Sequence, residues 1–341
     1  MFSGLSSLYS FSYCTVRDFQ NAMRGLSNYQ LSCCVNTLLQ TLSATWELSD
    51  LLERWDSAGV RADSHNVPMQ LKKVLAAMKS DHGHNSPHRD FLNCLDRNSF
   101  RLCVQHDADE VFLSILNFLQ QQMDDRALAL EIQNLYKVSV ETHLQCLECS
   151  WVQTQTSFQL SLHLHVKDDH DSLEGCISSF LEDQDLRGRD SCFCAQCGIK
   201  TPSKRVIKLL SLPRILCMQL KRYRSSRGDI RKLDCKVTFP ETFDFSEIAR
   251  GGFSRDFAQD EYTYTLYAVV VHSGGTMGGH YTAYVRPRGN QQWHYADDSH
   301  VEKVSLEQVQ AAYGTYNGGT AYMLMYRRSS KEEGRQPEFS G

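Results

Sequence analysis

Two pairs of cysteines, far apart in the chain, constrain the fold more than any other feature. Cys146 and Cys149 are separated by two residues, and so are Cys194 and Cys197. A two-residue gap lets both thiolates of a pair reach one ion, and two such knuckles complete a tetrahedral zinc site. The stretch between the pairs is longer than in a compact zinc ribbon, so strands must run out and back between them. We therefore expect a structural zinc ion on these four cysteines; the alternative is four reduced, buried thiols without a metal.

The remaining cysteines bear on the ligand set and on the cellular compartment. Cys192, two residues before Cys194, is either a substitute ligand or a bystander. The chain contains 13 cysteines, an odd number, and is too large to depend on disulfides. This usage indicates a reducing compartment in which thiolates serve metal binding and catalysis. The expected location is the cytoplasm, with the nucleus as the alternative.

Composition excludes several classes of protein. With 341 residues, 41% hydrophobic and 22% charged, the chain is typical of a soluble globular protein of one large domain or two lobes. A net charge of -4 provides no overall positive field that would attract nucleic acid or an anionic membrane. The sequence contains no run of about 18 apolar residues, so we expect no membrane-spanning helix. The N-terminus has no basic residue before Arg17, which argues against a secretory signal.

Helical patterns precede strand patterns along the chain. Apolar spacing predicts a helix from Val35, with Ser32 as its cap, and an amphipathic helix over 107–123. The segment 81–88, with three histidines, is expected as a solvated loop. Strand patterns follow at 158–166, 206–212, 215–220, 262–272, 280–286 and 321–326. Helices first and strands afterwards indicate an α+β fold.

The ends of the chain contain the parts of a thiol hydrolase. Cys33 and Cys34 lie at the start of the first expected helix, where the helix N-terminus lowers a thiol pKa, and spacing alone does not choose between them. His280 follows a Gly-rich turn into a strand, which suits a general base. Either Asp297 or Asp298 would orient its imidazole.

One more residue near the start of the chain completes the expected site. Asn28 lies five residues before Cys33 and offers an amide donor for the developing oxyanion. The expected chemistry is therefore attack by a thiolate on an amide carbonyl.

These residues lie in motifs that resemble the ubiquitin-specific protease family. The similar segments are Gly25–Gln40, Gln105–Glu110, Leu212–Tyr223, Gly279–Tyr284 and Trp293–Ser299, in the family's order, from about residue 24 to 326. The resemblance implies that Cys33 is the nucleophile, with Cys34 in the family's usual aromatic position. It also implies His280 as base and Asp297 as its partner. At the oxyanion site Asn28 is the expected donor, with Asp298 or backbone amides as the alternative.

The resemblance also implies an architecture. A papain-like ubiquitin-specific protease fold has a helical thumb, a β-rich palm and zinc-knuckle fingers. Here the N-terminal segment would be 1–23 and the catalytic domain 24–326, with the thumb at about 24–135 and the fingers at about 136–235. The palm would be the remainder of the domain, and 327–341 would be a disordered tail. The expected cofactor is structural zinc alone, and the expected partners are a ubiquitin-like modifier and its protein conjugates.

Within the family, three details resemble the interferon-induced member: the doubled Cys33–Cys34, His106 in place of a glutamine, and Cys192–Gly198. That member removes a two-domain, interferon-stimulated modifier and restrains type I interferon signalling, so components of interferon-receptor signalling are further expected partners. Asp109 and Glu110 form an acidic helix start that favours ubiquitin instead. A third alternative is a non-catalytic interaction protein that binds a signalling partner.

Three positions depart from the family pattern. Gln30 stands where the family has glycine, which costs about 1 kcal/mol if the backbone has a positive φ. Leu31 replaces a polar residue beside the oxyanion site, and Ala296 replaces a phenylalanine and would leave a gap. None of these changes removes a catalytic group.

Overall fold

The computed structural model describes most of the chain between Met23 and Ser329. The described residues are 23–56, 64–80, 86–167, 171–226, 229–249, 251–254, 262–276, 278–289, 291–314 and 319–329. The expected N-terminal segment lies outside them except for residue 23, as does the expected tail beyond residue 329. Among the described residues, no helix is both long and apolar enough to cross a membrane.

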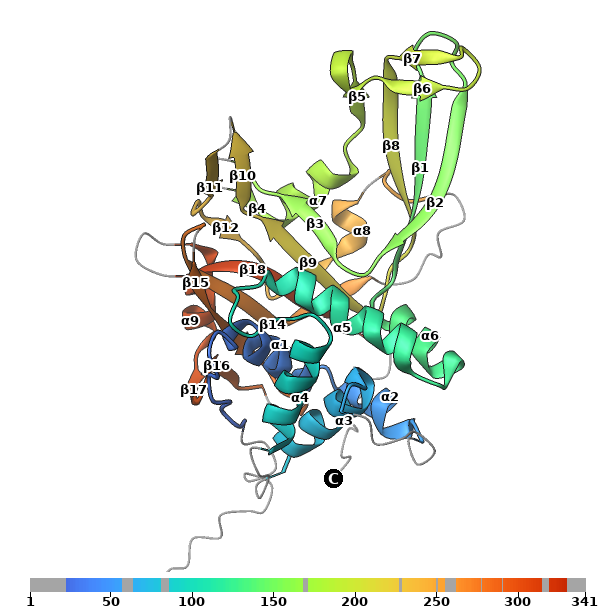
Figure 1. The fold of residues 1–341 in the computed structure, drawn as a ribbon. Coiled ribbons are helices and arrows are strands. Elements are labelled where there is room, and N and C mark those ends of the chain that lie inside the picture. Colours follow the sequence, from blue (N-terminus) through green and yellow to red (C-terminus); the bar gives the residue numbers. More distant parts are fainter. Residues whose placement is uncertain are drawn as a thin grey trace, which may run out of the picture.

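The first helices of the chain pack together on one side of the molecule (Figure 1). They are α1 (Cys33–Ala44), α2 (Trp46–Arg54), α3 (Val67–Met78), α4 (Ser86–Arg97), α5 (Ala108–Gln122) and α6 (Arg126–Tyr136). α5 begins at a side-chain cap, because the Asp107 carboxylate accepts hydrogen bonds from the N–H groups of Asp109 at 2.8 Å and Glu110 at 3.2 Å. α1 is buried along nearly its whole length. It packs against the central sheet, on strand β15.

The central sheet has the strand order β17-β16-β15-β14-β18-β9-β3, with β13 also paired to β14. The strands are β3 (Leu162–His165), β9 (Ile215–Lys221), β13 (Thr242–Asp244), β14 (Thr263–Gly274), β15 (Gly279–Val285), β16 (Trp293–Asp297), β17 (His300–Val304) and β18 (Thr320–Arg328). Neighbours are antiparallel except β3 and β9. Successive residues of β14 alternate between two cores: Val270 packs with the helices, whereas Val269 and Val271 pack on the opposite face. The sheet is therefore covered on both faces.

A second sheet projects away from the helices and the central sheet (Figure 1). Its order is β2-β1-β8-β5, built from β1 (Val138–Cys146), β2 (Val152–Gln159), β5 (Gln184–Leu186) and β8 (Ser203–Ser211). At its far end, β6 (Cys192–Cys194) and β7 (Ile199–Thr201) form a short hairpin. The strands run out and back between the two cysteine pairs, as the spacing of those pairs predicted.

Smaller elements complete the fold. Within the described residues they are α7 (Leu173–Leu181), α8 (Phe245–Ile248), α9 (Leu306–Gln310), the 3-10 turns Gly188–Asp190 and Ala311–Tyr313, the parallel pair β4 (Asp171–Ser172) and β12 (Val237–Thr238), and the hairpin of β10 (Tyr223–Ser226) and β11 (Asp229–Lys232). Of these elements, α7 and α9 cover the second face of the central sheet, where Leu173, Ile177 and Val309 are fully buried. The order of elements confirms the expected α+β class.

The segment 136–235, expected as fingers, divides between the two sheets. Strands β1, β2, β5 and β8 belong to the projecting sheet, whereas β3 and β9 lie in the central sheet. The reason is hydrophobic burial: Leu216 of β9 is buried on one face of the central sheet and its neighbour Cys217 on the other, so this strand requires cover on both faces. The projecting sheet is the thinner, more exposed part of the molecule.

Two other expectations need correction. The segment 81–88 is not wholly a solvated loop, because α4 begins at Ser86 and His88 is only 5% exposed. The apolar face of α4 holds His88 against the core. At the other end, β18 continues through Arg328 instead of ending at 326. Arg327 is buried because its guanidinium pairs with Glu47 at 2.6 Å and lies over the ring of Trp46.

Candidate active site

Cys33 is the first residue of α1, where the helix N-terminus faces the central sheet. Burial raises the pKa of the Cys33 thiol, and the Asp298 charge adds to that shift. The backbone N–H groups of Tyr281, Cys34 and Cys33 oppose the shift, because they donate toward the sulfur. Tyr281 directly follows His280, so Cys33 lies beside the start of the strand that carries His280. Ser32 does not cap α1 as expected.

Cys34 has a different environment from its neighbour. Its thiol is fully buried, and burial raises its pKa well above the ordinary value, with Cys33 and Asp107 adding to the shift. The contributions to this shift that the structure shows all disfavour the thiolate. Of the two adjacent thiols that the sequence could not distinguish, only Cys33 has N–H donors directed at its sulfur.

His280 and Asp297 meet across neighbouring strands. His280 is the second residue of β15 and Asp297 the last residue of β16. The Nε2 atom of His280 lies 2.6 Å from Oδ1 of Asp297. Both side chains are 40% exposed, so the pair opens to solvent. Of the two candidate acids, Asp297 therefore contacts the imidazole.

The start of β15 is held by a residue whose structural role the sequence did not reveal. The Gln105 amide donates to the carbonyl of Gly279, and the Gly279 N–H donates to Gln105 Oε1 at 3.0 Å. A Cβ atom at Gly279 would lie 2.2 Å from the Ser273 carbonyl oxygen, so only glycine fits. Gln105 therefore fixes the backbone next to His280. Its place in the family-like segment 105–110 was the only sequence signal.

Asp298 contacts two asparagines instead of His280. Asn28 Nδ2 donates to Asp298 Oδ2 at 2.8 Å, and Asn36 Nδ2 donates to Asp298 Oδ1 at 2.7 Å. Asn28 is further fixed through its Oδ1, which accepts from the backbone N–H of Ser32 at 3.2 Å. Asn28 and Asp298, the two side chains considered for the oxyanion site, thus lie in direct contact.

The three departures from the family pattern each have a structural counterpart. Gln30 has φ of 64°, the left-handed conformation in which a side chain is strained. Leu31 is 45% exposed, so its apolar side chain faces solvent beside the site. Ala296 is buried opposite Ala283 of β15.

The acidic start of α5 is not exposed as a whole. Asp109 is only 3% exposed, and its Oδ2 lies 2.8 Å from Nε2 of His163 on β3. Glu110, by contrast, is exposed. The pair joins α5 to the central sheet, so the Asp109 carboxylate serves internal packing and does not present a charge to a partner.

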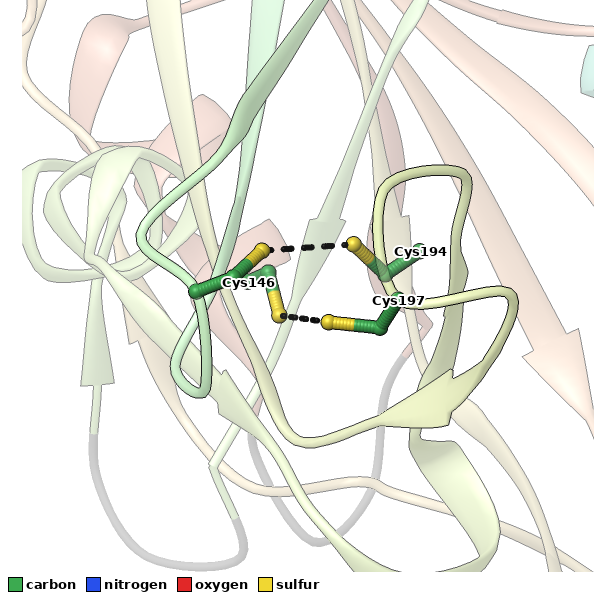
Figure 2. Close-up of side chains that lie close together, drawn as sticks. Cys146, Cys194 and Cys197 are labelled. Carbon is green, nitrogen blue, oxygen red and sulfur yellow. Dashed lines mark hydrogen bonds between the residues drawn. The ribbon is translucent and has the colours of Figure 1, made fainter.

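The four expected zinc ligands meet at the far end of the projecting sheet (Figure 2). Their Sγ atoms all lie within 4.8 Å of one another. Cys146 is 4.0 Å from Cys197, and Cys149 is 3.6 Å from Cys194. Tetrahedral Zn–S bonds of about 2.3 Å place sulfurs about 3.8 Å apart, so the group can hold one structural zinc ion. This agrees with the prediction from the sequence.

The two knuckles have matching turns. The Ser150 N–H donates to the Cys146 carbonyl at 3.0 Å, and the Gly198 N–H donates to the Cys194 carbonyl at 2.9 Å. Ser150 and Gly198 both have positive φ, 61° and 72°, which explains the glycine after the second pair. Cys192 lies outside the four-thiol group and its thiol contacts the Asp190 carbonyl instead, so it is the bystander.

Comparisons with known proteins agree with this geometry. The family model described as ubiquitin carboxyl-terminal hydrolase matches residues 24–326. Ubl carboxyl-terminal hydrolase 18 of Mus musculus is 31% identical over 326 residues, covering 93% of this chain and 88% of that protein. The Homo sapiens protein of the same name is 30% identical, covering 91% and 86%. Ubiquitin carboxyl-terminal hydrolase 47 of Xenopus tropicalis is 25% identical and is covered over only 28% of its length.

Solved structures show the same fold. A chain of the SAGA Ubp8/Sgf11/Sus1/Sgf73 DUB module bound to ubiquitin aldehyde matches with a TM-score of 0.76 and 23% identity, covering 91% of this chain and 70% of that chain. The same module bound to monoubiquitin gives a TM-score of 0.78 at 23% identity, with 92% and 70% covered. At this identity the likeness concerns the fold alone.

Proposed function

The chain belongs to the ubiquitin carboxyl-terminal hydrolase family of cysteine isopeptidases, and from this premise we propose how its residues cleave the bond and which modifier they release. The enzyme hydrolyses ubiquitin or ubiquitin-like conjugates. The observation that carries the residue assignment is the N–H donors directed at the Cys33 sulfur, next to the strand that holds His280 against Asp297.

We propose the following roles. Asp297 occupies Nε2 of His280, which leaves Nδ1 to accept the thiol proton of Cys33. The Cys33 thiolate then attacks the carbonyl carbon of the modifier's C-terminal glycine. The imidazolium returns its proton to the leaving lysine amine, and water, with the imidazole as base, hydrolyses the thioester. Free modifier and free thiol are regenerated.

The oxyanion of the tetrahedral intermediate needs hydrogen-bond donors. Asn28 Nδ2 carries two hydrogens, of which one donates to Asp298, so the other remains for the oxyanion. The backbone N–H groups at the start of α1 are further donors. Replacing Asn28 by alanine should lower kcat by roughly 10²-fold. An unchanged kcat would assign the oxyanion to backbone donors alone.

We propose that the modifier is the two-domain, interferon-stimulated one. Three features support this choice: the doubled cysteine, His106, and the segment 192–198 with its extra Cys192. The buried Asp109–His163 pair removes half of the acidic helix start that had favoured ubiquitin, and Glu110 remains. Exposed apolar side chains on and beside the projecting sheet offer a surface for an apolar modifier face; they are Leu147, Trp151, Val152, Phe158, Phe193 and Ile199.

The second candidate substrate is ubiquitin. It is favoured by the likeness to a module solved with ubiquitin aldehyde and with monoubiquitin. Further proposals follow from the choice of the two-domain modifier: a role in restraining type I interferon signalling, partners among the signalling components of that receptor, and action in the cytoplasm or nucleus.

Two reporters test the proposal. C-terminal amide reporters of the two modifiers would be compared by kcat/KM, with Cys33→Ala as the blank. The two-domain modifier should be preferred. A preference of tenfold or more for ubiquitin, about 1.4 kcal/mol, would make the chain an ordinary deubiquitinase. Cleavage of neither reporter, with both modifiers still bound, would indicate a non-catalytic interaction protein.

A further inference from the structure

His88 on α4 is a buried histidine that the proposed mechanism does not use. Its side chain is covered by the core, and Nε2 lies 2.8 Å from Oδ1 of Asn36 on α1. Burial, together with the charge of Arg24, lowers the pKa of His88 to about 4. The imidazole is therefore neutral at physiological pH and carries a single N–H.

The contacts of Asn36 fix which nitrogen of His88 carries that hydrogen. Asn36 Nδ2 faces three acceptors: the carbonyls of Leu26 and Ser27, at 3.4 and 3.2 Å, and Asp298 Oδ1 at 2.7 Å. A flipped amide would set its oxygen against all three. Asn36 Oδ1 must therefore face His88, and as a buried acceptor it requires the N–H on Nε2.

Asn36 in turn holds Asp298. The Asp298 carboxylate receives one amide hydrogen from Asn36 and one from Asn28. The residue is itself in the left-handed region, at φ of 48°, so local backbone preference does not hold it in place. The Asn36 contact is the side-chain bond that anchors the carboxylate to the buried helix α1, and Asn28 is then oriented by Asp298.

We propose that His88 is a positioning residue for the oxyanion-binding side chain: the His88 N–H fixes the Asn36 amide, Asn36 fixes Asp298, and Asp298 orients Asn28. This inference rests on the proposed role of Asn28. Its expected signature is loss of kcat with little change in KM, because the oxyanion exists only in the transition state and its intermediates. A histidine that merely supports the core would lower stability and leave kcat per folded molecule unchanged.

The experiment compares His88→Gln with His88→Met. The two replacements are of similar length, but only glutamine has an N–H that reaches the position of Nε2. In the full chain, kcat and KM are measured on the preferred modifier reporter, together with alkylation of Cys33 by iodoacetamide, which needs a thiolate but no oxyanion donor. Leu95→Ala, a fully buried position on α4, is the control for lost stability.

We expect His88→Met to lower kcat by about tenfold or more, with KM and the alkylation rate within about twofold of wild type. His88→Gln should keep kcat within about threefold. Equal kcat in the two variants, or a parallel loss of alkylation, would overturn the inference, as would an equal loss of kcat in Leu95→Ala. If His88→Met does not fold, His88→Asn takes its place, since its amide is too short to reach Asn36. Failure of the wild-type chain to cleave either reporter would count against the proposed function. If the wild type cleaves and the His88 variants have the same kcat as the wild type, this inference alone is wrong.

Discussion

Cysteines form two candidate sites in this chain, and the surroundings of their thiols differ between the two. At the start of α1, two adjacent thiols have separate environments: one faces N–H donors and the other faces the core. At the end of the projecting sheet, four thiols from two separate knuckles converge within 4.8 Å. The first arrangement suits one reactive thiolate, and the second suits a bound cation. The neighbours of a thiol, not its sequence spacing alone, decide which chemistry it can perform.

The largest expected effect is a complete loss of activity with no change in zinc content. Cys33→Ala should abolish reporter cleavage and leave the zinc content at one ion per chain, because the nucleophile is lost and the fingers are untouched. Cys34→Ala should retain most activity. Cleavage rates and elemental analysis on the same samples provide the measurement, and the reverse pattern of activity would move the nucleophile to Cys34.

A change in the second region should spare the chemistry of the first. Cys149→Ser should release the zinc and lower Tm by about 5 °C or more, since metal binding is coupled to folding. Alkylation of Cys33 by iodoacetamide should stay near the wild-type rate. Cys192→Ser is the matched control and should keep its zinc, because that thiol lies outside the group. A stable, metal-free wild-type protein would contradict the zinc assignment.

The pH dependence of Cys33 should depend on Asp298. Burial raises the pKa of Cys33 and the Asp298 charge raises it further, so the thiolate fraction at neutral pH falls below that of a free thiol. Alkylation of the free enzyme should therefore accelerate as pH rises through the alkaline range. Asp298→Asn should move the curve toward lower pH, because one charge opposing the thiolate is gone. A curve that does not move, or that moves to higher pH, would mean that the Asp298 charge does not act on the Cys33 thiol.

The smallest effect concerns the left-handed residues next to the thiols. The second knuckle places Gly198 at φ of 72°, whereas the turn before Cys33 places Gln30 at φ of 64°. Gln30→Gly should raise the free energy of unfolding by about 1 kcal/mol, since glycine relieves the left-handed strain. Denaturant titration would measure it. A loss of stability would show that the Gln30 side chain makes contacts worth more than the strain.

Short sequence motifs were enough to predict those features of the fold and the site that depend on residues close together in the chain. The α+β class, the position of Cys33 at a helix start and the ligand group of the fingers all follow from nearest neighbours along the chain. The contacts that join distant elements did not follow. His88 and Asn36 are 52 residues apart, and Asp109 and His163 are 54 apart, so their pairing depends on how α4, α1, α5 and β3 pack. Ser32 had the right type for a cap, but its hydroxyl accepts the Tyr29 N–H instead.

The hydrogen bond between Asn28 and Asp298 joins residues 270 positions apart, and this separation matters during synthesis on the ribosome. A ribosome adding roughly 5–20 residues per second needs on the order of tens of seconds to travel that length. During this time Cys33 has already been made, while its proposed base His280 and the anchor of the proposed oxyanion donor have not. With the proposed roles, the nascent chain cleaves no conjugate before these residues are made, and a product truncated before residue 280 keeps Cys33 but lacks its proposed base. On this proposal, synthesis past Asp298 is what makes the enzyme active.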